Sequence, residues 1–232
     1  IAGIADNDPA AAADYAYQLA SMGDKDADRM LGIVTSRVLG SGGHLEASVW
    51  AENLPDGSMR AAALDRVAHD YVAHDPEGAA AWAERFAGQA HNARVIEEVG
   101  DEWAERDPVA AIDWLNSLDA GKGKSEGLSS AFGEWAKRDP TAASQHLVSM
   151  PDSPDRDSAI SGFSRRLASE NPQAAIAWAS EINDANSREN ALVRAGQSMF
   201  RRDASGTREW LATSGLPPAA QEQIVNPPQS RR

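Results

Sequence analysis

The sequence predicts an all-α protein, a right-handed α/α superhelix of about seven helical hairpins. Three observations predict it: a 32-residue period of aromatic residues, a helix-start signal seven residues before each aromatic position, and apolar residues at helical spacing after each start. A fixed period of 20–50 residues is typical of repeat arrays, in which each unit buries its face against its neighbours. The aromatic positions are Tyr15, Trp50, Trp82, Trp114, His146, Trp178 and Trp210, and Trp103 and Trp135 lie 32 residues apart in a second register.

The first helix of each repeat is expected to begin at an Asp or Asn, usually followed by Pro. The Asp or Asn side chain can accept a hydrogen bond from the free amides of the first helical turn, and Pro loses nothing there. Repeats therefore start near residues 8, 43, 75, 107, 139, 171 and 203. The signals are Asp8-Pro9, Asp75-Pro76, Asp107-Pro108, Asp139-Pro140, Asn171-Pro172 and the weaker Asp203-Ala204, with Gly43-His44 as the irregular copy.

Apolar residues trace one face of this first helix. Positions 4, 7, 8 and 11 after the Asp or Asn are Ala, the aromatic residue, Ala or Leu, and a large apolar residue, a spacing that marks an amphipathic helix. A second helix follows a short turn and ends at the next Asp or Asn. Its large apolar residues, four positions before that Asp or Asn, are Leu39, Tyr71, Trp103, Trp135, Leu167 and Met199.

The domain organisation follows from the period. Residues 1–225 are predicted to form a single repeat array, and residues 226–232 a C-terminal tail. Ile1 to Asn7 has the pattern of the last turn of a second helix, so a longer parent chain is expected. The glycine-rich junction of residues 40–43 is costly in a helix, and a kink is expected there.

The composition excludes several functions. A formal net charge of −13 disfavours binding to nucleic acids or to anionic membranes, because phosphate contacts need a basic surface. No run of 18 apolar residues could cross a bilayer. The chain has no Cys, so disulfides and thiol chemistry are absent. No cofactor and no metal site is predicted.

The offset between Pro and Trp resembles that of tetratricopeptide-type α-solenoids. Pro76–Trp82, Pro108–Trp114 and Pro172–Trp178 keep the family's spacing of six, and Phe132 matches its second-helix aromatic. The period is 32 rather than 34, and Leu128 and Trp135 replace small residues of the family. The motif Asp-Pro-x-x-Ala-Ala-x-x-Trp also resembles tandem repeats in large bacterial proteins. The resemblance implies a binding scaffold from a bacterium, which an N-terminal extension could place in the envelope.

Few residues suggest chemistry. The five histidines, none with metal-ligand spacing on one helix, are His44, His69, His74, His91 and His146. His146 stands at an aromatic position and is expected to pack there. Residues 121–125 are similar to parts of a phosphate-binding loop and of a nucleophile elbow, but both need a preceding strand, so a turn between helices is predicted. The acidic pairs Glu97-Glu98 and Asp101-Glu102 are interpreted as a solvated face.

A basic residue recurs near the start of the second helix. Two interpretations are open: a ladder of ion pairs between repeats, or a row of cations that lines a groove for an acidic peptide. The residues are Lys25, Arg60, Arg94, Lys124, Arg156 and Arg188.

The function predicted from the sequence is a protein- or peptide-binding scaffold without catalysis. Solenoids present extended grooves that suit peptides and helices. One alternative is a hydrolase-like enzyme with the hairpins closed into an α/α toroid, although catalytic loops there are long and every connection here is short. The other alternative is a purely structural spacer in a larger envelope protein.

Overall fold

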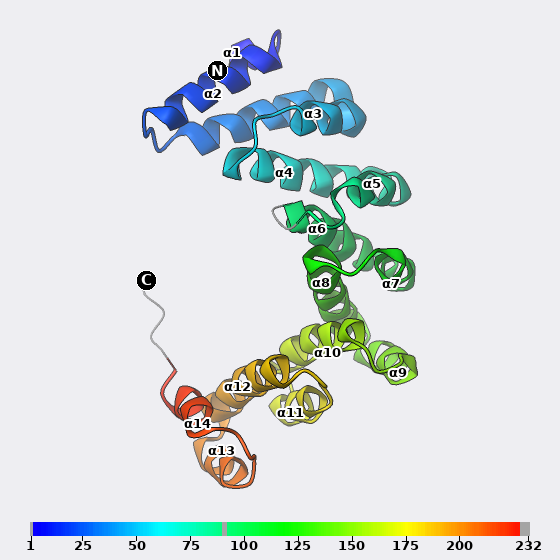
Figure 1. Ribbon diagram of the computed structural model, residues 1–232, viewed down its shortest axis with the longest axis vertical. Coiled ribbons are helices and arrows are strands. Elements are labelled where there is room, and N and C mark those ends of the chain that lie inside the picture. The colour runs from blue at the N-terminus through cyan, green and yellow to red at the C-terminus, as the bar shows by residue number, and fades with distance from the viewer. Residues whose placement is uncertain (1, 90–91, 228–232) are drawn as a thin grey trace. The chain divides into compact units, whose positions relative to one another are not determined.

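The structure, a computed structural model, describes residues 2–89 and 92–227 (Figure 1). All regular secondary structure in these residues is helical, with fourteen α-helices and one short 3-10 helix, so the predicted all-α class is confirmed. The chain divides into two compact units. Unit 1 comprises Ile1–Trp103 with Leu118–Gly123, and unit 2 comprises Ala104–Ser117 with Lys124–Arg232. The superhelix, the number of hairpins and the single array of residues 1–225 stay predictions.

The predicted helix starts are confirmed at six Asp or Asn residues. In each case the side chain accepts a hydrogen bond of 2.9–3.1 Å from the amide three residues later. This contact satisfies an amide that has no partner within the helix. The helices that begin this way, called A helices, are α2 (Pro9–Ser21), α5 (Pro76–Ala83), α7 (Pro108–Ser117), α9 (Pro140–Ser149), α11 (Pro172–Ser180) and α13 (Ala204–Leu211).

The helices that precede, separate and follow the A helices are called B helices. They are α1 (Ala2–Ala5), α4 (Ser58–His74), α6 (Ala93–Ala104), α8 (Lys122–Arg138), α10 (Pro154–Leu167), α12 (Ala185–Arg202) and α14 (Pro218–Val225), and the 3-10 helix η1 (Glu84–Phe86) lies between α5 and α6. The irregular copy is α3 (Ala27–Glu52), in which a B helix and an A helix meet at a kink. Gly43 has φ of +69° there, a conformation that glycine adopts without a steric penalty, so the expected kink is confirmed.

Small residues bring the helices together. The Ala at the fourth position after the helix start is completely buried in six repeats: Ala12, Ala47, Ala79, Ala111, Ala143 and Ala175. The side chains at the eighth position after the helix start, which are Ala or Leu, are buried as well. The period of the sequence is therefore a period of buried positions, as packed helices require.

The aromatic positions are less uniform. Trp82 and Trp114 are buried, as is Trp135 of the second register. A larger group is half-buried, namely Trp50, Trp103, His146, Trp178 and Trp210. Tyr15 is 45% exposed and departs from the expected pattern. At three later positions a ring on the preceding B helix packs against the side chain: Tyr71 against Trp82, Phe132 against His146 and Phe163 against Trp178. The described helix before Tyr15 is the four-residue α1, which has no aromatic residue.

Within unit 1, α3 packs against α1, α2 and α4, and α4 packs against α5. Figure 1 shows α3 and α4 side by side. Salt bridges from α4 to α6 place α6 next to α4 on another side. The B helices of unit 1 therefore adjoin one another in chain order.

Within unit 2, α10 packs against α9, α11 and α12, and α12 packs against α13 and α14. The backbones of α8 and α10 approach closely, because a Cβ atom at Gly162 would lie 1.7 Å from the carbonyl oxygen of Ser129. None of the helices in the described part of the chain has the length and apolar composition that crossing a membrane requires.

Candidate functional site

Most of the recurring basic residues of unit 2 hold the ends of A helices. Lys124 donates to the carbonyl oxygen of Asn116 over 3.1 Å and pairs with Asp155 at 2.9 Å. Arg156 donates to the carbonyl oxygen of Leu147. Arg188 donates to the carbonyl oxygens of Ile182 and Asn183, in the turn that follows α11. The cations at the Asn116 and Leu147 carbonyls satisfy groups that the helix leaves open and interact favourably with its dipole.

The basic residues of unit 1 have other partners. Arg60 pairs with Asp56 in the same turn, and Arg94 pairs with Asp65 of the neighbouring B helix at 3.2 Å. Lys25 is exposed. These contacts favour a structural role for most of the six residues, and the row of cations for an acidic peptide stays a prediction.

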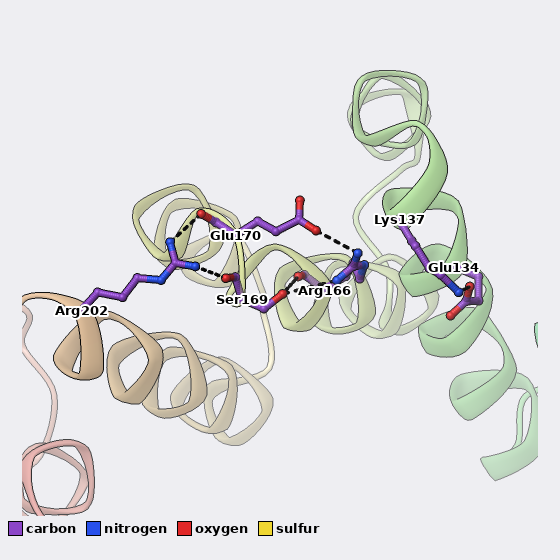
Figure 2. A network of polar contacts seen from close by, with 6 residues as sticks. All are labelled: Glu134, Lys137, Arg166, Ser169, Glu170 and Arg202. Carbon is purple, nitrogen blue, oxygen red and sulfur yellow. Dashed lines mark hydrogen bonds and ion pairs between the residues drawn. The ribbon is translucent and has the colours of Figure 1, made fainter.

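Other polar contacts of unit 2 join successive repeats. Arg202 donates to the backbone carbonyls of Ser169 and Glu170, about one repeat earlier in the chain (Figure 2). Arg166 pairs with the carboxylate of Glu170 at 2.8 Å in the same network. On α8, the ammonium of Lys137 pairs with Glu134, which raises the pKa of Lys137. Asp157, itself buried, accepts hydrogen bonds of 2.8 Å from the amides of Asn183 and Asp184.

The turn near residue 121 is shorter than expected. Helix α8 already begins at Lys122, so Gly123, Lys124 and Ser125 lie on the helix. Among the described residues no strand precedes this segment, and Lys124 is occupied by Asn116 and Asp155. Residues 118–121 alone therefore connect α7 and α8, and residues 122–125 form the first turn of α8 rather than the predicted turn.

An open groove of about 560 Å³ lies among α3, α4 and α6 of unit 1. Its apolar lining residues are Gly32, Leu39 and Ala62. The polar lining residues are Asp65, Arg66, His69, Asp70 and Glu98. Glu102 adjoins them through His69. We call this feature the acidic groove, because it gathers four carboxylates from two helices.

The centre of the polar lining is a cluster of three side chains. Nδ1 of His69 lies 3.0 Å from Oε1 of Glu98 and 3.1 Å from Oε1 of Glu102. His69 comes from α4, whereas Glu98 and Glu102 are one turn apart on α6. The two glutamate side chains are about one quarter exposed, and His69 is 59% exposed. The cluster is therefore shielded on the side of the glutamates and open on the side of the imidazole.

The electrostatics of the groove favour a cation. Burial raises the pKa of the Glu98 carboxyl, and the carboxylates of Asp65 and Glu102 raise it further, while the hydrogen bond from His69 acts in the opposite direction. The guanidinium of Arg94 contacts Asp65 at the edge of this group. Negative charge that is partly withdrawn from water interacts strongly with a positive ligand.

A second histidine cluster has a structural explanation. The ring of His44 stacks on Tyr71 with centroids 4.4 Å apart and on His74 at 5.7 Å. Nδ1 of His74 donates to the backbone carbonyl oxygen of Asp70 over 2.8 Å. Asp70 completes the cluster. Ring stacking at the kink of α3 explains this arrangement.

The remaining histidines have different outcomes. His146 packs against Phe132 and Trp135, with ring centroids 5.8 and 5.4 Å apart, as expected of a residue at an aromatic position. His91 lies outside the described residues, as do residues 228–232 of the predicted tail.

Comparisons with protein-family models, curated proteins and solved structures found no match for the chain.

Sequence reasoning missed the cluster of His69, Glu98 and Glu102. Its residues lie far apart in the sequence, and the acidic pairs Glu97-Glu98 and Asp101-Glu102 have the pattern of a solvated face. The structure corrects this, because Glu98 and Glu102 are half-buried. The period contained a signal: one repeat after His69 is position 101, which lies between the two glutamates.

Proposed function

We propose that this protein is a scaffold of helical repeats, similar to tetratricopeptide arrays, that binds a basic segment of a partner polypeptide in the acidic groove. The groove itself carries the proposal. It combines carboxylates from α4 and α6 with the apolar surface of Leu39 and Ala62. A segment with lysine or arginine beside small apolar residues is complementary to such a lining.

The scaffold part of the proposal rests on the repeats. Completely buried Ala residues and capped helix starts recur at the period of the sequence. A chain built in this way extends as a right-handed superhelix and presents a long surface. The proposal includes no catalytic step, and a basic partner replaces the acidic one that the row of recurring cations had suggested.

Fluorescence anisotropy tests the proposal with a labelled peptide of alternating Lys and Ala and its counterpart of alternating Glu and Ala. The protein should bind the lysine peptide and not the glutamate peptide. The double variant Glu98→Gln/Glu102→Gln should bind it at least about tenfold more weakly, since each tenfold is about 1.4 kcal/mol. The control Asp113→Asn/Asp119→Asn removes the same charge from exposed positions outside the groove.

The outcomes separate clearly. An equal loss in the control variant would show that overall charge attracts the peptide, without a site. Equal binding of both peptides, or of neither, would contradict the proposed partner chemistry.

A further inference from the structure

We infer that His69, Glu98 and Glu102 bind a divalent transition-metal ion, with Zn²⁺ the best match. The inference does not rest on the proposed peptide function, because the site is defined by its own three donor atoms. All of these atoms lie within 4.8 Å of one another. Imidazole nitrogen and carboxylate oxygen are both ordinary ligands of Zn²⁺.

The distances fit a coordination sphere. Bonds of about 2.0–2.1 Å place adjacent ligands of a tetrahedral Zn²⁺ roughly 3.3 Å apart. The imidazole nitrogen is 3.0 and 3.1 Å from the two carboxylate oxygens. A small adjustment of three side chains would thus admit an ion, with no change in the backbone.

The scaffold of the site is regular. Glu98 and Glu102 are separated by one turn of α6 and point the same way, and His69 comes from the adjoining α4. Ligands on helices are held more firmly than ligands on loops. Three protein ligands leave a fourth position open to water or to another ligand, and the exposed side of His69 gives the ion a path from solvent.

The charge of the surroundings also fits. Asp65 adds a further carboxylate near Glu98, which with Glu102 leaves the cluster negative when His69 is neutral. Arg94 pairs directly with Asp65 and interacts with Glu98 only through the weaker electrostatic attraction of its charge. An ion with two positive charges would offset the mutual repulsion of Glu98 and Glu102 and link α4 to α6.

Isothermal titration of ZnCl₂ into the full chain at neutral pH tests the site. One Zn²⁺ per chain should bind, and the variant His69→Ala should lose at least about tenfold in affinity because one of three ligands is gone. Glu98→Gln should show a similar loss. The matched control is His74→Ala, on the same helix and similarly exposed, which should bind as the unchanged protein does.

Thermal unfolding gives a second readout. Zn²⁺ in large excess over its dissociation constant should raise the Tm by about 5–10 °C, since it binds only the folded state. The rise should disappear in His69→Ala. Circular dichroism without metal verifies that each variant keeps its helical content.

Several results would overturn the inference. If the protein binds no Zn²⁺, His69 only bridges the two carboxylates by hydrogen bonds and the inference fails. Binding that survives His69→Ala, or is lost in His74→Ala, would assign the ion to another position. Mg²⁺ binding as tight as that of Zn²⁺ would indicate a general attraction to carboxylates, because Mg²⁺ prefers oxygen ligands.

Discussion

Unit 2 and unit 1 use their polar side chains in different ways. In unit 2, Lys124 and Arg156 hold the carbonyl ends of A helices. Arg188 holds carbonyls of the turn after α11, and Asp157 holds amides of the same turn. In unit 1, the polar side chains of α4 and α6 gather around an open groove. The difference shows how one repeat can serve two purposes: where polar groups satisfy the backbone they fix the fold, and where they face one another across a groove they can meet a ligand.

The largest effect is expected at the aromatic positions, where burial differs within each unit as well as between the units. Trp114 of unit 2 is buried, whereas Tyr15 of unit 1 is 45% exposed. Trp114→Ala should lower the free energy of unfolding by about 3–5 kcal/mol, as for a large ring removed from a core. Tyr15→Ala should cost under about 1 kcal/mol, since surface changes are small. Urea unfolding followed by circular dichroism measures both, and equal losses would remove the contrast.

Close backbone packing in unit 2 is tested by two helical glycines. A Cβ at Gly162 would meet the Ser129 carbonyl, whereas one at Gly133 would have its nearest neighbours from other helices at 3.7 Å. Gly162→Ala should lower the free energy of unfolding by about 3 kcal/mol through overpacking. Gly133→Ala should be neutral or stabilising by up to about 1 kcal/mol, because Ala favours helix. Tm values of the pair verify the order, and a tolerated Gly162→Ala would mean that α8 and α10 are not in close contact.

The buried carboxylate of unit 2 should matter next. Asp157→Ala leaves the amides of Asn183 and Asp184 without their acceptor, so a loss of about 2 kcal/mol in the free energy of unfolding is expected. Asp157→Asn keeps one acceptor oxygen and should lose less. Denaturant titration of both variants distinguishes a hydrogen-bonding role from mere space-filling, in which the isosteric Asp157→Asn would cost nothing.

The helix caps should contribute similarly in both units. Asp139→Ala removes an N-cap of unit 2 and should cost about 1 kcal/mol, as should Asp75→Ala in unit 1. The Asn variants should cost only a few tenths of a kcal/mol, since Asn171 already caps α11. Differential scanning calorimetry measures these changes. A neutral Asp→Ala change would contradict the role of the cap.

The smallest effect concerns the pH dependence of unit 1. Burial, Asp65 and Glu102 raise the pKa of Glu98, so the folded state keeps this proton to a higher pH than the unfolded chain does. The free energy of unfolding should therefore rise as the pH falls through the raised pKa toward the ordinary value of about 4.3. In Glu98→Gln that contribution is gone, and the Tm should vary less with pH in this window. Glu209→Gln, a change at an exposed residue of unit 2, should leave the profile as it is.

Local chemistry explains why much of the fold could be predicted from the sequence. An Asp followed by Pro favours a helix start wherever it stands, and the spacing of Ala12 or Ala111 from it places the side chain on the buried face. Gly43 likewise predicts its own kink. Each of these properties depends on a few neighbouring residues.

Properties that depend on neighbours in space were harder to predict. Tyr15 is exposed although it stands at an aromatic position, and Lys124 points toward Asn116 rather than toward a groove. The groove brings together His69 of α4 and Glu98 of α6. No local sequence signal predicts how these two helices are rotated about their axes relative to each other. Only the 32-residue period relates such positions, and it relates them by register without fixing where their side chains point.

Deleting one period tests most directly the claim that the chain is an array of equivalent repeats. Removing residues 140–171 joins Asp139 to Pro172 and leaves every remaining helix start in register. The shortened chain should keep its helical content per residue and unfold cooperatively in a circular dichroism melt, because each repeat offers its successor the same face. A control deletion of residues 140–167, four residues shorter, should lose both. Loss of cooperative unfolding in the in-register deletion as well would contradict the account.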